Sequence, residues 1–333
     1  MMDRREIIGG ATAFIAVLAA RAQVPGRVYR VGYLGYTATN TPDDDRVWGA
    51  FVQRLRELGF AEGRNLVIEQ RYAEGRDERY AKFAAEMVAL KTDVVVAGTG
   101  TAARALMSAS PALPIVTTGV PDPVRAGLIV SLARPGGQLT GISNLADELV
   151  PKRLELLKGA VPAARQIAFA RCPACGVNAG LSEAEVRALH VEREAAARSL
   201  GVELLALDVN ASADFTAATA TVRRERPEAL LIGANQINAA LRDQWLAFAA
   251  EQRLPMLAPY RGFGALMSYG PEATAIYRKA AEYVASILGG ARPGDLPMEQ
   301  PTKFEFVVNL KMAKAIGLTI PRSLLVRADE VIQ

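Results

Sequence analysis

The sequence is poor in the residues from which most active sites and metal sites are built. The 333-residue chain contains one histidine, His190, and two cysteines, Cys172 and Cys175. Catalytic triads and zinc sites combine several such side chains, so the sequence supports neither. It also lacks the G-x-S-x-G elbow of hydrolases, the Walker loop of ATPases and the G-x-G-x-x-G fingerprint of dinucleotide enzymes. We therefore expect a protein that is not an enzyme and that holds no cofactor and no metal.

Long basic runs are absent as well. Lysine and arginine together number 39 against 35 acidic residues, which gives a formal net charge of +4. The basic residues stand singly with Glu or Asp close by, a pattern typical of a solvated surface, so no nucleic-acid partner is expected. Half of the residues are hydrophobic and 22% are charged, as in globular proteins, and the length allows two domains.

One apolar run does occur, at the very beginning of the chain. Arg4 and Arg5 precede the apolar stretch Ile7–Ala20, and Ala20 and Ala22 supply the small residues at positions −3 and −1 of a cleavage site. This layout predicts an export signal peptide over residues 1–22, cleaved after Ala22. The arginine pair favours the twin-arginine route, with ordinary secretion as the alternative. No later stretch is long enough to span a membrane, so we expect a soluble periplasmic protein.

From residue 28 onward, predicted strands and helices alternate. This alternation predicts an α/β architecture with parallel sheets joined by right-handed crossovers. Two successive rounds of similar length predict two Rossmann-like lobes joined by a hinge. We expect an N-terminal lobe of residues 27–145 plus 264–296, which includes the strand 265–269, and a C-terminal lobe of residues 146–263 plus 297–333. A groove between the two lobes is then the natural ligand site.

The loop after the strand Val94–Ala97 has the composition of an anion-binding turn. Gly98 and Gly100 allow a sharp turn and leave room for a ligand. Thr101 is expected to be the N-cap of the following helix, 102–108, where free backbone N–H groups attract anions. Thr99, Gly100 and Thr101 are therefore candidates for binding a carboxylate, although an ordinary strand-to-helix turn also needs small residues. Ligands of open α/β sheets bind at this edge, outside the carboxyl ends of the strands.

Three further candidates come from the first lobe. Tyr36 and Thr37 follow the first strand, and Tyr36 is expected to stack on an apolar or aromatic ligand. Asp122 lies between two prolines at the end of the fourth strand. It either pairs with a ligand ammonium group or caps the segment that follows it.

Four candidates come from the second lobe. Asn235, Gln236, Tyr260 and Arg261 follow strands whose ends should face the groove. An arginine in this place either clamps a ligand carboxylate through two parallel hydrogen bonds or forms an ion pair between the lobes.

The two cysteines form a C-x-x-C pair after a strand and before a helix. In an oxidising compartment such a pair forms a local disulfide, stays as free thiols or acts as a redox couple. We favour the disulfide or the thiol pair over redox catalysis, and over a zinc site, which needs further ligands. His190 is expected to lie on the surface of its charged helix.

Several segments resemble a known family, the periplasmic substrate-binding proteins of ABC transporters of the tryptophan/tyrosine-binding type. The similar segments run in order along nearly the whole chain after the signal: 30–34, 55–59, 62–69, 122–124, 131–137, 152–157, 267–271, 299–306, 309–311 and 328–332. The resemblance implies a type I periplasmic-binding-protein fold. It also implies, as partners, a small-molecule solute, an inner-membrane permease and its ATPase. Relatives usually carry Asn-Pro where this chain has Cys172-Pro173, so the family's ligand contact at this loop does not carry over directly. Cys172 is the ligand-binding candidate at this position.

Together these observations predict the solute-binding component of an ABC importer, which acts as a monomer. The solute is expected to be a small molecule such as an aromatic amino acid or a related carboxylate. Two alternatives remain at this point: a binding protein that serves a sensor, and a thiol oxidoreductase that uses Cys172 and Cys175.

Overall fold

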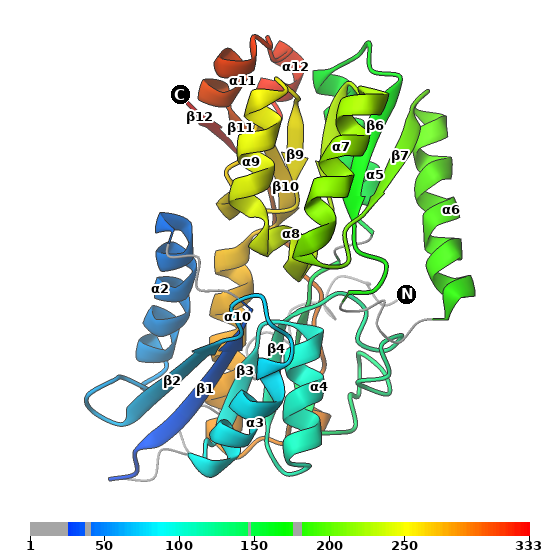
Figure 1. Ribbon diagram of the computed structural model, residues 1–333. Helices are drawn as coiled ribbons and strands as arrows, with labels where there is room; N and C mark the ends of the chain where they lie inside the picture. Colours follow the sequence, from blue (N-terminus) through cyan, green and yellow to red (C-terminus); the bar gives the residue numbers. More distant parts are fainter. Residues whose placement is uncertain (1–25, 37–40, 146–147, 176–181) are drawn as a thin grey trace, which may run out of the picture.

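The computed structural model describes residues 26–36, 41–145, 148–175 and 182–333. Two lobes, each built on its own sheet, lie one above the other (Figure 1). The α/β architecture with two lobes expected from the sequence is therefore confirmed. The expected signal peptide, residues 1–22, lies outside the described residues. Within the described ranges, no helix has the length and apolarity needed to cross a membrane.

The first lobe contains a five-stranded parallel sheet in the order β2-β1-β3-β4-β5. Its strands are β1 (Tyr29–Gly35), β2 (Leu66–Tyr72), β3 (Val94–Ala97), β4 (Ile115–Val120) and β5 (Leu139–Ser143). One face packs on α2 (Pro42–Glu57) and α10 (Ala273–Leu288), the other on α3 (Arg79–Ala89) and α4 (Gly100–Ala109). All four residues of β3 are buried, which accounts for its unbroken apolar sequence, because a strand covered on both faces has no polar side.

The second lobe contains a seven-stranded sheet in the order β12-β11-β10-β9-β8-β6-β7. Its strands are β6 (Gln166–Arg171), β7 (Glu203–Asp208), β8 (Ala229–Ile232), β9 (Met256–Ala258), β10 (Met267–Pro271), β11 (Phe304–Asn309) and β12 (Glu330–Ile332). The pairs are parallel, apart from β10 with β11.

Helices cover both faces of this sheet. One face packs on α5 (Val150–Ala160), α6 (Glu183–Ser199), α11 (Leu310–Ile316) and α12 (Arg322–Leu325). The other packs on α7 (Phe215–Glu225), α8 (Gln236–Ala240) and α9 (Arg242–Glu251). Three short 3₁₀ turns complete the described elements: η3 (Ser212–Asp214), η4 (Arg261–Phe263) and η5 (Pro293–Asp295).

Strand β10 and helix α10 follow each other in the chain and belong to different lobes. The sequence predicted that both return to the first lobe, and for the strand this prediction is wrong. Met267 pairs with Leu257 of β9 and with Val308 of β11, so β10 fills the gap between these two strands in the second sheet. Helix α10 packs beside α2 in the first lobe, as expected (Figure 1).

Strand β5 has no counterpart among the predicted elements. Gly141 lies between the two hydrophobic residues of the strand, Leu139 and Ile142, and has a φ of +128°. A Cβ at this position would lie 2.3 Å from the carbonyl oxygen of Thr117 on the neighbouring strand, so the close approach of β4 and β5 requires glycine. Gly141 permits the pairing of β4 with β5, and it also removes the hydrophobic alternation from which a strand is predicted.

A buried arginine joins the two strands that lead to the cleft. Arg153 of α5 is 1% exposed, and its Nε donates a 2.8 Å hydrogen bond to the carbonyl oxygen of Tyr269. Its Nη2 lies 3.4 Å from the carbonyl oxygen of Pro259 and donates to it. The chain enters the cleft after Pro259 and crosses to α10 after Tyr269. Arg153 therefore holds together the starting points of a cleft loop and of a lobe crossing.

We predict that Arg153→Met lowers the free energy of unfolding by about 2 kcal/mol, because buried carbonyl groups lose their donor. Urea denaturation followed by circular dichroism measures the loss. The neighbouring Lys152→Met is the matched control, since Lys152 forms a partly exposed ion pair with Glu155 and should change stability by less than about 0.5 kcal/mol. Equal losses in the two variants would contradict the role given to Arg153.

Candidate ligand-binding cleft

A cavity of about 530 Å³ lies between the two lobes. This volume is in the range of small-molecule sites in proteins. Both lobes contribute to its wall, and aromatic rings are prominent in it: Tyr33, Tyr36, Trp48, Tyr72, Phe169, Tyr260 and Tyr277.

The cavity lies where the strand order of each sheet reverses. In the first sheet β1 lies between β2 and β3, so the next two strands of the chain add to opposite sides of it. In the second sheet β6 lies between β7 and β8 in the same way. The loops after β1 and β3 diverge from each other, as do the loops after β6 and β8, which opens a crevice at each carboxyl edge. The residues that follow these four strands line the cavity on both sides.

The first lobe supplies an aromatic wall centred on Tyr33 of β1. The ring of Tyr33 lies 5.1 Å from that of Trp48 and 5.7 Å from that of Tyr72, centroid to centroid. Its hydroxyl group is 2.8 Å from the hydroxyl group of Tyr277 on α10. Burial is the main cause that raises the pKa of Tyr33, so its phenol is neutral near pH 7. The wall is therefore apolar with uncharged hydroxyl groups.

Tyr36 presents a hydroxyl group to which no described residue is hydrogen-bonded. The residue is 8% exposed and lines the cavity, and its buried hydroxyl has no hydrogen-bond partner among the described residues. Burial, together with the negative charges of Asp77 and Glu78, raises its pKa to about 12. A buried donor of this kind costs free energy until something accepts its hydrogen bond.

The N-terminus of α4 faces the cavity, but its cap differs from the predicted one. Thr99, rather than Thr101, is the N-cap, and its Oγ1 accepts a 3.1 Å hydrogen bond from the N–H of Ala102. Thr99 and Gly100 line the cavity, and Thr101 does not. The helix begins at Gly100, so Thr101 sits one position inside it, turned out of the wall.

The wall of the second lobe is held by an amide frame. Asn235 caps α8 by accepting a 2.8 Å hydrogen bond from the N–H of Asn238. The side chain of Asn238 donates to the carbonyl oxygens of Ala170 and Gly233, at the ends of β6 and β8, and accepts from Nε1 of Trp245. This buried frame fixes the position of the loop that brings Asn235 and Gln236 to the cavity. Burial raises the pKa of Asp77 in the first lobe, and the side chain of Gln236 opposes that rise.

Of the two roles expected for Arg261, the structure shows the ion pair between the lobes. Its Nε lies 3.3 Å from Oδ1 of Asp43 on α2, and its Nη1 pairs with Glu330 of β12. Tyr260, the residue before it, lines the cavity with its ring 5.9 Å from that of Phe263. The ion pair with Asp43 thus joins the two lobes at one side of the cleft.

Glu305 of β11 is a partly buried carboxylate in the same wall. Its Oε1 accepts no hydrogen bond from the part of the chain that the structure describes, and it lies 4.0 Å from Nη2 of Arg46 on α2. Burial raises the pKa of Glu305, the guanidinium group of Arg46 opposes the rise, and the charge of Asp43 adds to it.

Asp122 lies outside the cavity wall. Its side chain is 42% exposed, and Oδ1 accepts a 2.9 Å hydrogen bond from the N–H of Arg125, so it caps the turn that follows. Of the two roles expected for Asp122, the structure shows the cap of the following segment. The remaining candidate of the first lobe, Thr37, lies outside the described residues.

Cys172 and Cys175 form a disulfide bond, and both line the cavity. His190 on α6 is half-buried rather than at the surface, because it lies against Glu194, with Nε2 2.9 Å from Oε1. Burial lowers its pKa. Throughout the described ranges, His, Cys, Asp and Glu side chains form no group of three or more that could hold a metal ion.

The model of the family described as "ABC transporter substrate binding protein" matches residues 40–332. The chain belongs to this family. A curated relative, the tyrosine-binding protein of Clostridioides difficile, is 26% identical over 280 residues, which make up 83% of this chain and 78% of the relative.

Two solved structures are similar to this member of the substrate-binding family over 92% of its chain and 100% of theirs. A conserved domain protein of Vibrio cholerae is 28% identical with a TM-score of 0.81. A Streptococcus pneumoniae ABC domain in complex with L-Trp is 23% identical with a TM-score of 0.79, which supports the fold. The predicted family and the two-lobed periplasmic-binding fold are both confirmed.

The sequence did not single out several residues that this substrate-binding protein places in the cavity wall: Tyr33, Asp43, Trp48, Tyr72, Phe169, Arg171, Arg193, Arg242, Tyr277 and Glu305. Tyr33 and Tyr72 carried a usable signal, because the sequence predicts strands over residues 28–34 and 66–72, and each tyrosine lies within two residues of the carboxyl end of its strand. Trp48 and Tyr277 carried none, since they are on helix faces whose neighbours are far away in the sequence.

We predict that Thr99→Ala lowers the free energy of unfolding by about 1 kcal/mol, because the first turn of α4 loses its cap. Thr101→Ala should stay within about 0.5 kcal/mol of the wild type. Chemical denaturation of the two variants side by side measures both values. A larger loss of stability in Thr101→Ala than in Thr99→Ala would show that Thr101 is the cap.

We predict that Glu305→Gln makes the protein more thermally stable at about pH 8 and leaves it unchanged at about pH 4. An acid whose pKa is raised in the folded state contributes stability only while it is protonated, and that contribution is lost as the pH rises. The glutamine variant has no such loss, so the difference in Tm should grow with pH. Glu251→Gln, which removes a carboxylate with a 59% exposed side chain, is the control. A difference in Tm that is flat across this range would refute the prediction.

Proposed function

We propose that this protein captures an aromatic amino acid, or a related aromatic carboxylate, between its two lobes and delivers it to the permease of an ABC importer. The aromatic wall around an interlobe cavity of about 530 Å³ is the observation that carries this proposal. Tyr33, Trp48 and Tyr72 offer ring edges and faces for a planar apolar group. The tyrosine-binding relative and the L-Trp complex add support from similar proteins.

The polar end of such a ligand has fitting partners in the same cavity. The N-terminus of α4 at Thr99 and Gly100 suits a carboxylate, because free N–H groups and the helix dipole both favour negative charge there. The hydroxyl group of Tyr36 can donate to the same ligand. Glu305, together with Asp43 to Asp45 at the start of α2, places negative charge in the wall, which suits an ammonium group.

The proposal includes a binding cycle without chemistry. The protein is not an enzyme, acts as a monomer, and opens and closes about a hinge between the lobe of residues 27–145 plus 272–296 and the lobe of residues 146–271 plus 297–333. These limits assign β10 to the second sheet and α10 to the first lobe. Its partners are an inner-membrane permease and its ATPase, and no nucleic acid. It works in the periplasm, with the signal cleaved after Ala22 and export by the twin-arginine route or by ordinary secretion.

The two alternatives from the sequence differ from this proposal in what they require. A sensor partner requires the same cleft, and neighbouring genes for a permease and an ATPase would decide against it. A thiol oxidoreductase requires an accessible sulfur, whereas Cys172 and Cys175 are 5% and 8% exposed.

Isothermal titration calorimetry with L-tryptophan, L-tyrosine and L-phenylalanine tests the ligand. We expect micromolar or tighter binding of at least one of them and no binding of aliphatic amino acids. Tyr36→Phe should weaken this binding about tenfold, about 1.4 kcal/mol, because the ligand loses a donor. The same change should not lower the Tm of the free protein, because the hydroxyl group has no hydrogen-bond partner among the described residues to lose.

Tyr80→Phe is the matched control for Tyr36→Phe. Tyr80 is 1% exposed and does not line the cavity, and its hydroxyl group accepts a hydrogen bond from Thr99. Its loss should leave the affinity within about twofold of the wild type. If none of the three aromatic amino acids binds, the proposed ligand class is wrong.

A further inference from the structure

The disulfide bond lies at the point where the second sheet receives a ligand. Cys172 is the first residue after β6, and the loop that follows β8 runs alongside it. These two strands flank the reversal of strand order in this lobe, and the crevice between their ends is where ligands enter open α/β sheets. Both cysteines are almost fully buried and still line the cavity. The bridge therefore forms part of the cavity wall.

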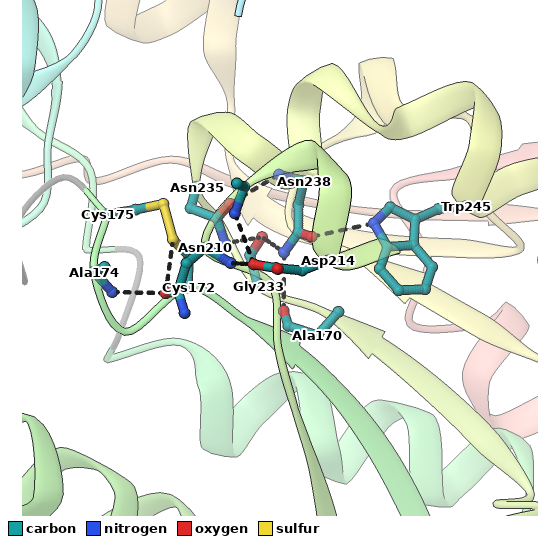
Figure 2. The surroundings of a disulfide bond; sticks show 11 residues. Ala170, Cys172, Ala174, Cys175, Asn210, Asp214, Gly233, Asn235, Asn238 and Trp245 are labelled. Carbon is teal, nitrogen blue, oxygen red and sulfur yellow. Dashed lines mark hydrogen bonds between the residues drawn. A yellow bond between two sulfur atoms is a disulfide. The ribbon is translucent and has the colours of Figure 1, made fainter. Parts of the chain in front are cut away.

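The loop is fixed from its outer side by a neighbouring turn. Oδ1 of Asn210 accepts a 3.0 Å hydrogen bond from the N–H of Ala174, inside the bridged loop, and lies 3.6 Å from Sγ of Cys172 (Figure 2). Asn210 is held in turn, because its own N–H donates a 2.8 Å hydrogen bond to Oδ2 of Asp214. These contacts hold the backbone of the loop in place, while the bridge fixes the two sulfurs.

The strand ends beneath the loop are held independently of the sulfurs. Asn238 links the carbonyl oxygens of Ala170 and Gly233 and is braced by Trp245 (Figure 2). Asn238 is 1% exposed, so this frame is buried. Opening the bridge is therefore expected to alter the wall locally and to leave the lobe folded.

We propose that the Cys172–Cys175 disulfide is a specificity-determining surface of the cleft, against which the apolar part of the ligand packs, and that tight binding requires the oxidised bridge. This inference rests on the proposed function. A disulfide offers polarisable sulfur without hydrogen-bond donors, which suits contact with an aromatic ring. Phe169 and Tyr260, rings of the same lobe, line the cavity with it.

Reduction changes the shape of this surface. A dithiol reductant transfers two electrons and two protons: the S–S bond breaks, two thiols form, and the dithiol closes to its own disulfide. The sulfurs, which a bond holds at about 2.05 Å, must then separate to non-bonded contact. Binding sites tolerate displacements of only about 0.5 Å, so we expect affinity to fall about tenfold.

The effect must be reciprocal. If the oxidised protein binds the ligand tenfold more tightly than the reduced one, the ligand makes the bridge tenfold harder to reduce. For a two-electron couple this is a shift of about 30 mV to more negative potential.

The experiment compares L-tryptophan, L-tyrosine and L-phenylalanine binding by oxidised protein, by protein reduced with dithiothreitol, and by Cys172→Ser/Cys175→Ser. We expect reduction and the double substitution to cause the same loss of about tenfold, with unchanged far-UV circular dichroism. Redox titration with and without saturating L-tryptophan should show the shift in potential. A purely structural bridge would change the Tm of the free protein and leave that potential unmoved.

The outcomes separate the two proposals. If the oxidised protein binds none of L-tryptophan, L-tyrosine and L-phenylalanine, the proposed function fails and this inference fails with it. If the oxidised protein binds and both altered forms bind equally well, only the disulfide surface is refuted. If the reduced and the double-serine proteins both unfold, the bridge supports the fold rather than a local wall, which also refutes the inference.

Discussion

The contents of the cleft follow from the direction of the strands. Parallel strands place all of their carboxyl ends at one edge of a sheet, and each sheet has one position where its order reverses and the loops separate. In this protein the two reversals, β1 with β3 and β6 with β8, line one cavity. Tyr36, Thr99, Cys172 and Asn235, which follow these four strands, owe their positions to this arrangement.

The two lobes use different means to build their halves of the wall. The first lobe supplies rings that come from β1, β2, α2 and α10, and one helix N-terminus. The second lobe supplies a disulfide-closed loop and an asparagine frame, both held by hydrogen bonds behind the surface. The ion pair of Arg261 with Asp43 lies between the lobes, so contact between the lobes and formation of the wall depend on some of the same residues.

The alternation of strands and helices was sufficient to predict the lobes, because it follows from local periodicity. Positions after strands were sufficient to find Tyr36, Thr99, Gly100, Cys172 and Asn235, since the edge of a sheet is a local property. The prediction that Thr101 caps α4 was wrong because Thr99 and Thr101 both have a suitable side chain, and only the backbone geometry shows that Thr99 is the N-cap. The prediction that β10 belongs to the first lobe was wrong because strand pairing depends on contacts between distant parts of the chain. Trp48 and Tyr277 were missed because their positions in the cavity wall depend on how helices from distant parts of the chain pack.

The separation of β10 from α10 has a consequence for how the molecule unfolds. Helix α10 completes the core of the first lobe with Ile276, Ala280 and Val284, yet it is attached at both ends to strands of the second sheet. Neither lobe can therefore be made as a continuous fragment of the chain with its core intact. Unfolding of one lobe by heat or denaturant therefore destabilises an element of the other lobe. The two lobes should unfold in a single cooperative transition.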